Sequence, residues 1–281
     1  MLKHRLTTQQ IQAYTHHLQL EEKSTATIEK YLRDIRAFAC WLDGREISKE
    51  LTSEWKTYLA ARGYAPATVN AMLSALNSLL EFLDLPECRV RFLKIQRRMF
   101  RDADRELTKD DYQRLLTTAQ TLGRERLELL VETIGTTGIR VSEVQYITVE
   151  AARQGRAEIS LKGKIRVILL PAKLCRKLLK FAKKQKNASG AIFRTKSGKE
   201  LGRRQIWAEL KGLCKHAGVD PGKVFPHNLR HLFATVFYGN CKDIAKLADL
   251  LGHSSIETTR IYLAASGIEH RRELERLGLI S

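Results

Sequence analysis

The sequence contains no apolar run of about 18 residues, the length that a membrane-spanning helix needs. Its first ten residues, MLKHRLTTQQ, lack the apolar core of a signal peptide. The five cysteines are odd in number and scattered, without a CxxC pair, so neither a full disulfide framework nor a finger-type zinc site is expected. We therefore expect a protein of the reducing cytoplasm, with no membrane partner.

Proline and glycine are also scarce, at 5 and 17 of 281 residues, which argues against a disordered or collagen-like chain. A hydrophobic content of 43% is enough to build buried cores. Basic residues number 49 and acidic residues 31, a net charge of +18. An excess of this size predicts a polyanionic partner, and nucleic acid is favoured over a membrane surface.

Residues 1–88 are predicted to form a compact all-α domain. Apolar residues recur at helical spacing after the candidate N-cap Ser24 and again after Pro66. Shorter helices are expected over residues 8–20 and 52–62. The chain length allows a second, larger domain over residues 107–281.

A basic stretch, residues 89–106, separates the two predicted domains and has no sustained helical stripe. We expect an extended linker whose cations lie along a phosphate backbone; the alternative is a solvated loop. The candidate DNA-binding residues are Arg89, Arg91, Lys94, Arg97, Arg98 and Arg101. Residues 99–281 hold 34 basic and 20 acidic residues, a net of +14 against +4 for residues 1–98, so the second part should bind the polyanion more strongly.

The second part is predicted to be mainly helical with one β-hairpin. In the segment 157–171, polar and apolar residues alternate, and β-branched residues are frequent on both sides of a Lys-Gly-Lys turn. This pattern predicts the hairpin. Lys162 lies at the tip of this hairpin, where a flexible ammonium can reach into a groove and donate a proton. Helices are expected over residues 107–120, 125–134, 172–186, 203–217, 227–238 and 243–251, with a last one near the C-terminus.

Two motifs place cations at predicted helix starts. Arg140 follows Gly138 in TTGIRVSE, where a guanidinium and helix N-terminal amides can hold an anion together. In PHNLRHLFAT, His227 and Arg230 lie at i and i+3, on one helix face. Imidazole and guanidinium suit phosphate chemistry, because one moves protons near neutral pH and the other holds charge. His231 is expected on a different face.

A third motif, LGHSSIETTRIY, places His253 and Tyr262 nine residues apart. On one unbroken helix they would face opposite ways. Gly252 and the two serines that follow His253 interrupt the chain, so a separate short helix can return Tyr262 toward His253. Taken singly, each of these residues has a plain structural explanation: a surface arginine, a helix-terminal polar cluster, a core tyrosine or a solvated lysine.

The order and context of the six residues resemble the tyrosine recombinases of the phage-integrase type: Arg140, Lys162, His227, Arg230, His253 and Tyr262. The resemblance covers about residues 107–265 as the catalytic domain, with a C-terminal tail helix. Residues 1–88 look like the family's helical core-binding (SAM-like) DNA-binding domain. The resemblance therefore implies a mainly α fold with a small β-hairpin.

The resemblance implies that Tyr262 attacks a DNA phosphate, forming a 3′-phosphotyrosine and freeing a 5′-hydroxyl. Arg140 and Arg230 would neutralise the transition state, and Lys162 would protonate the leaving oxygen. His227 would assist proton transfer, and His253 would hydrogen-bond a non-bridging oxygen. Glu143 fits the position that supports the first arginine and a histidine. The resemblance requires neither metal nor cofactor.

The implied partners are double-stranded DNA with paired recombination sites and three further copies of the chain in a homotetramer. The resemblance also allows an accessory DNA-bending or excisionase protein. The hairpin turn is one residue shorter than the family's common GKGxK form, which leaves Lys164 as the alternative to Lys162. A tail from about residue 268 is expected to dock in a neighbouring copy or on its own domain.

We expect a recombinase that integrates or excises a mobile element. An Xer-like resolvase of chromosome or plasmid dimers is the nearest alternative, and catalytic motifs do not separate the two. A non-catalytic DNA-binding regulator also suits the charge and the helices. A regulator of this kind would not explain why the motifs around Arg140, Lys162, Arg230 and Tyr262 occur in this order.

Overall fold

The computed structural model describes residues 5–95, 105–161, 164–195, 197–260, 262 and 275–276. The chain forms two compact units, Met1–Arg97 and Arg98–Ser281. Both units are built mainly from α-helices, and the described strands form one two-stranded sheet in the second unit, which confirms the predicted fold class. No described helix is both long enough and apolar enough to cross a membrane.

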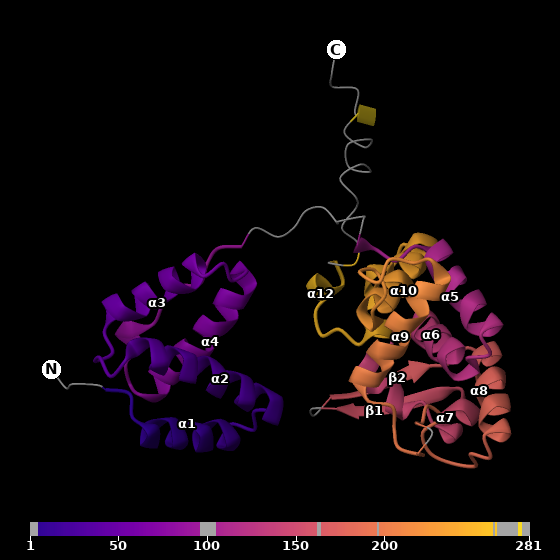
Figure 1. Ribbon diagram of the computed structural model, residues 1–281, viewed down its shortest axis with the longest axis horizontal. Coiled ribbons are helices and arrows are strands. Elements are labelled where there is room, and N and C mark those ends of the chain that lie inside the picture. Colours follow the sequence, from indigo (N-terminus) through magenta and orange to yellow (C-terminus); the bar gives the residue numbers. More distant parts are fainter. Residues whose placement is uncertain are drawn as a thin grey trace. The chain divides into compact units, whose positions relative to one another are not determined.

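The first unit is a bundle of four helices: α1 (Thr8–Leu20), α2 (Thr25–Leu42), α3 (Lys49–Ala61) and α4 (Pro66–Phe82) (Figure 1). A short 3-10 helix, η1 (Pro86–Cys88), follows them. The side chain of Ser24 accepts from the Thr27 N–H and caps α2, as the sequence predicts. Apolar residues of α2, α3 and α4 meet in the core, where Phe38, Trp55 and Leu76 are almost fully buried.

Two asparagines of α4 hold the segment that follows η1 against the first unit. Asn77 donates from Nδ2 to the Val90 carbonyl (2.9 Å) and accepts from its N–H (2.8 Å). Asn70, two turns earlier, makes the same pair of bonds with Leu93, at 2.9 and 2.7 Å. Side chains of α3 donate to three further carbonyls of this part of the chain. Thr52 donates to the carbonyl of Cys88, Lys49 to that of Arg89 and Lys56 to that of Arg91.

The segment over residues 89–95 is therefore extended, as the sequence predicts, but its backbone is packed on α3 and α4. This segment belongs to the first unit, which extends to Arg97. Arg89, Arg91 and Lys94 are exposed, and Nη1 of Arg89 lies 3.6 Å from Oε2 of Glu81. Arg97, Arg98 and Arg101 lie outside the described residues.

The second unit holds the remaining described elements. Its helices are α5 (Lys109–Thr121), α6 (Glu125–Thr137), α7 (Val149–Gln154), α8 (Ala172–Lys184), α9 (Arg203–Ala217), α10 (Pro226–Cys241), α11 (Ile244–Leu251) and α12 (Ile256–Arg260). A 3-10 helix, η3 (Val141–Tyr146), takes the place of the helix expected after Arg140. The strands are β1 (Arg156–Leu161) and β2 (Lys164–Leu169).

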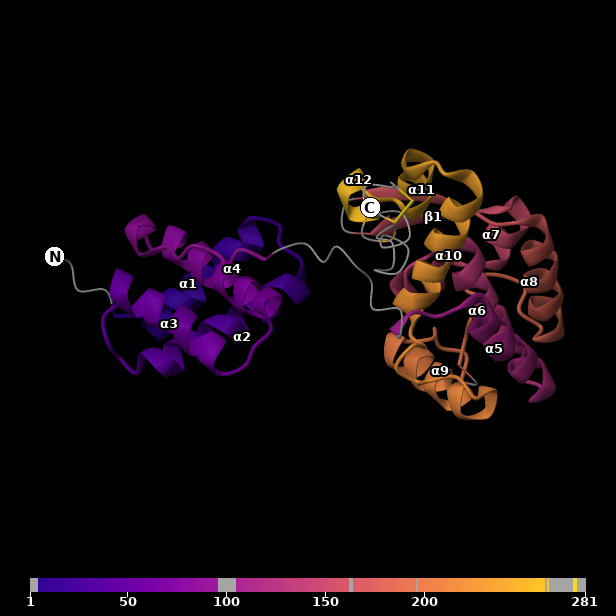
Figure 2. The same cartoon turned by 90° about the horizontal axis from the view of Figure 1, so that it is seen from above.

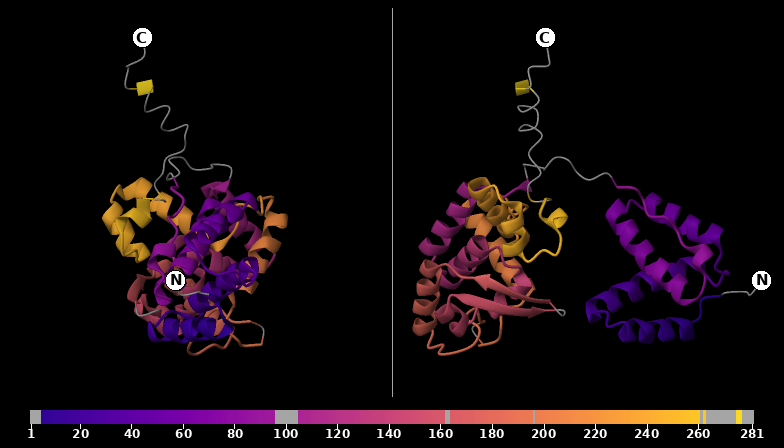
Figure 3. Two further views of the ribbon diagram at one scale, coloured as in Figure 1. Left: turned by 90° about the vertical axis from the view of Figure 1, so that its left-hand side faces the viewer. Right: turned by 180° about the vertical axis from the view of Figure 1, so that it is seen from behind.

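Helix α6 lies at the centre of the second unit. It packs against α5, α8 and α10, and α9 packs on the other side of α5 (Figure 2). The strands pair antiparallel, with Leu161 opposite Lys164 and Arg156 opposite Leu169 (Figure 3). One face of this hairpin is part of the core, where Ala157, Ile159 and Ile168 are buried. Of the C-terminal helix predicted from about residue 268, only Glu275 and Arg276 are described.

We expect Asn77→Leu to destabilise the first unit by about 2–4 kcal/mol, because the buried N–H and carbonyl of Val90 both lose their partner. Urea unfolding of the full chain measures the loss. Ser53→Ala, on the exposed side of α3, is the control and should stay within about 0.5 kcal/mol of the parent. Equal stability of the two variants would show that the hydrogen bonds between Asn77 and Val90 contribute nothing to the free energy of unfolding.

Candidate active site

The turn at the end of α6 places Arg140. Gly138 has φ +63° and ends the helix, and a Cβ there would lie 2.4 Å from Cδ1 of Phe233. Only glycine fits both the backbone angle and the space. The chain then extends through Arg140 into η3, and the Arg140 side chain stays 43% exposed.

Glu143 lies under Arg140 as a buried carboxylate between two guanidinium groups. It accepts from the Arg140 N–H at 2.7 Å and from Nη1 at 2.9 Å. Oε2, the oxygen that accepts from the Arg140 N–H, also accepts from Nη2 of Arg166, at 2.9 Å. The sequence assigns Glu143 a supporting role toward the first arginine and a histidine; its hydrogen-bond partners among the described residues are two arginines.

Arg166 is a site residue that the sequence motifs did not single out. Its side chain points inward from β2 with only 14% exposed, while Ile165, Val167 and Leu169 on the other face are exposed. Its Nη1 donates to the Leu251 carbonyl, at the end of α11. Burial lowers the pKa of Arg166 to about 10, and the nearby Arg230 adds to the effect. The signal in the sequence is a single cation at an inward position of an apolar strand.

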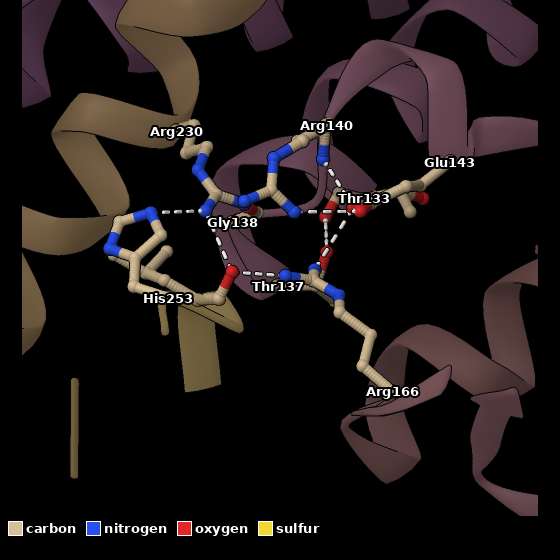
Figure 4. Close-up of polar contacts among 9 residues, drawn as sticks. Thr133, Thr137, Gly138, Arg140, Glu143, Arg166, Arg230 and His253 are labelled. Atoms are coloured by element: carbon tan, nitrogen blue, oxygen red, sulfur yellow. Dashed lines mark hydrogen bonds and ion pairs between the residues drawn. The ribbon is translucent and has the colours of Figure 1, made fainter. Parts of the chain in front are cut away.

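Arg230 is the most deeply buried cation of the site, with 2% of its surface exposed. Its guanidinium donates to the carbonyls of Gly138 and Leu251, the latter at 2.8 Å (Figure 4). The same Nη2 lies 2.9 Å from Nε2 of His253. Burial lowers the pKa of Arg230, with repulsion from Arg140 adding to the shift and contact with the Tyr262 hydroxyl opposing it.

Three imidazole rings surround Tyr262, which is 6% exposed. The ring of His253 stacks on it at 5.7 Å and 12°, and that of His227 lies at 5.8 Å. The short helix α12 follows the break after Gly252, as the motif predicts. His231, expected on another helix face, lies 5.2 Å from the ring of Tyr262 and is part of the same cluster.

Both motif histidines are neutral at pH 7. Burial is the main cause that lowers the pKa of His253 to about 4, followed by repulsion from Arg230, Arg140, Arg166 and His227. Burial and the two motif arginines also lower the pKa of His227. Both rings therefore keep a lone pair that accepts a hydrogen bond or a proton.

Lys162 lies outside the described residues, and of Lys164 only the backbone, at the start of β2, is described. The hairpin itself forms as predicted. Among the described residues no cluster of three His, Cys, Asp or Glu side chains has the arrangement of a metal site. The five cysteines are free.

We expect Glu143→Gln to destabilise the second unit by about 3–5 kcal/mol, because it leaves the largely buried Arg166 without its compensating charge. Thermal unfolding of the full chain measures the loss.

Glu257→Gln is a matched control. Its ion pair with Arg260 has the same i, i+3 spacing but is exposed, so it should contribute less than about 1 kcal/mol. Similar losses in the two variants would contradict a special role of the Glu143 carboxylate.

Comparison with known proteins identifies the family. Residues 105–267 match the phage integrase family and residues 11–85 match its N-terminal SAM-like domain. The tyrosine recombinase XerA of Thermococcus kodakarensis is 29% identical, covering 94% of this chain and 93% of the relative. The tyrosine recombinase XerD of Brucella suis is 32% identical, with 84% and 85% coverage.

Solved structures share the fold. XerH bound to its difH substrate, before cleavage, has a TM-score of 0.69 at 20% identity, covering 95% of this chain and 84% of that one. A lambda integrase dimer on a core site has a TM-score of 0.72 at 16% identity, with 91% and 94% coverage. The chain therefore belongs to the phage integrase family of tyrosine recombinases, enzymes of site-specific recombination that cut and rejoin DNA through a tyrosine intermediate.

Proposed function

We propose that Tyr262 is the nucleophile of this recombinase and that it attacks a phosphate held by Arg140 and Arg230. The observation that carries the proposal is the surroundings of the tyrosine. Its ring lies within 5.2–5.8 Å of three imidazole rings, and its hydroxyl contacts Arg230. A phenol needs a nearby base and nearby cations to act as a nucleophile near neutral pH.

The reaction then divides among the residues of the cluster. Neutral His227 takes the phenol proton as the Tyr262 oxygen bonds to phosphorus. Arg140 and Arg230 neutralise the charge that develops on the phosphate oxygens. Lys162 protonates the 5′-oxygen as its bond to phosphorus breaks. The 5′-hydroxyl of a second strand reverses these steps, so no external energy source is required.

The substrate is two duplex sites brought together by four copies of the chain, with an accessory DNA-bending or excisionase protein as a further partner. A lambda integrase tetramer bound to a Holliday junction shares this fold, with a TM-score of 0.72, which supports the tetramer. The exposed Arg89, Arg91 and Lys94 contact the DNA backbone, and Arg97, Arg98 and Arg101 are further candidate contacts by sequence. A DNA substrate and free cysteines support a cytoplasmic location.

Two biological roles fit this chemistry. Integration or excision of a mobile element is our first expectation from the sequence, although its catalytic motifs do not separate the two roles. Similarity to XerA and XerD over nearly the whole chain favours the alternative, an Xer-like resolution of DNA dimers. Recombination of two directly repeated sites on one circle by this protein alone would support resolution; a requirement for an excisionase would support the mobile-element role.

We expect Tyr262→Phe to bind DNA normally but to form no covalent complex, because it keeps the packed ring and lacks the attacking oxygen. A nicked suicide substrate, followed by denaturing electrophoresis, measures the adduct. Tyr238→Phe is the control, since Tyr238 packs near the same cluster and should form adduct like the parent. An adduct that persists in Tyr262→Phe would overturn the assignment.

A substrate with a different leaving group distinguishes the roles of Lys162 and Lys164. We expect Lys162→Ala to lose cleavage of ordinary DNA and to regain it with a 5′-bridging phosphorothiolate, whose sulfur leaves with little need for a proton. Lys164→Ala should cleave both substrates. The reverse pattern would transfer the general-acid role to Lys164.

A further inference from the structure

The hydrogen bonds of His253 determine which of its ring nitrogens carries the proton. Nε2 lies 2.9 Å from Nη2 of Arg230, and a guanidinium only donates (Figure 4). Nε2 is therefore the acceptor, and the proton of the neutral ring is on Nδ1. Nδ1 lies 2.8 Å from Oγ1 of Thr259, so it donates to that hydroxyl.

Burial and the charged groups around His253 keep the ring neutral. Arg230 comes from α10, Arg140 from the start of η3 and Arg166 from β2, and His227 and Tyr262 complete the surroundings. Burial and these cations lower the pKa of His253 to about 4, so a doubly protonated ring is rare at neutral pH.

This arrangement is opposite to the role that the family resemblance implies for His253, a hydrogen bond to a non-bridging phosphate oxygen. To donate to a non-bridging phosphate oxygen, His253 must carry a proton on Nε2, the nitrogen that accepts from Arg230 in the DNA-free chain. Nδ1 must then accept, and its partner must become a donor. A hydroxyl does either, because it has one O–H and two lone pairs.

Building on the proposed function, we propose that Thr259 is a positioning residue whose hydroxyl selects the tautomer of His253. In the DNA-free chain it accepts from Nδ1–H. When the phosphate takes over the Arg230 donor, the hydroxyl turns and donates to Nδ1, and Nε2–H faces the phosphate. One proton leaves Nδ1 and one joins Nε2 through exchange with water, so the ring stays neutral and no net proton is taken up.

The position of Thr259 suits this role. It is fully buried, on the short helix α12 that ends just before the tyrosine. Tyr262 follows it by three residues, so the segment that positions the nucleophile also positions the hydroxyl. Its neighbour Thr258 is exposed and provides a matched control.

Nitrogen-15 NMR of the histidine rings tests the tautomers directly. We expect Nδ1–H in the DNA-free protein and Nε2–H in a complex of Tyr262→Phe with its site, both neutral at pH 7.5. A doubly protonated His253 in the complex, or the same tautomer in both states, would overturn the proposal.

Cleavage kinetics test the hydroxyl itself. Thr259→Val keeps the shape but leaves Nδ1 without a partner, so single-turnover cleavage at saturating DNA should fall roughly tenfold to a hundredfold at pH 7.5. Thr259→Ser should recover to within about threefold, and Thr258→Val should match the parent. The deficit of Thr259→Val should shrink as the pH falls from 7 toward 5, because the ring, whose pKa is about 4, then begins to be protonated and carries Nε2–H without the hydroxyl.

Unchanged cleavage in Thr259→Val, or an equal loss in Thr259→Ser, would overturn the proposal. A deficit independent of pH, with a matching drop in thermal stability, would indicate a packing role and would also overturn it. The parent protein serves as the reference for the function itself. If it forms no adduct that depends on Tyr262, the proposed function fails; if it does and Thr259→Val is normal, only this inference fails.

Discussion

The carboxylate of Glu143 compensates the concentration of positive charge on which the site depends. Burial lowers the pKa of both Arg166 and Arg230, and Arg140 lies close enough to each to lower it further. Among the hydrogen-bond partners of these guanidinium groups within the described residues, Glu143 is the only carboxylate. One negative charge for three positive ones leaves a site of net positive charge, which is what a DNA phosphate requires.

Two helix ends supply the rest of the compensation. The carbonyls of Gly138 and Leu251, at the C-terminal ends of α6 and α11, both accept from Arg230. A helix C-terminus carries partial negative charge, so it stabilises a buried cation without adding a formal charge. Each helix ends at a glycine with positive φ, Gly138 or Gly252, against which a neighbouring side chain packs too closely for a Cβ. Burial, together with the remaining excess of positive charge, lowers the pKa of His227 and His253 and keeps both rings neutral.

The sequence by itself determined the helical class of both units, the hairpin and most helix positions, because capping residues and apolar spacing are local signals. It also determined the family, since the motifs around Arg140, Arg230 and Tyr262 are contiguous in sequence. The return of Tyr262 toward His253 followed from the break at Gly252. These features depend on residues within about one helix length of each other.

Only the tertiary structure decided which groups meet across elements. Arg166 of β2 meets Glu143 and α11, and His231 meets Tyr262, through contacts between segments that no local pattern relates. In the sequence, the segment 89–95 resembles a free basic linker because it is rich in cations and has no helical stripe. Its attachment depends on hydrogen bonds from Asn70 and Asn77 to its backbone and on the burial of Val90, which are contacts between segments that no local pattern relates. The tautomer of His253 depends on Arg230 and Thr259 at once, so it is a property of the folded site and of neither motif alone.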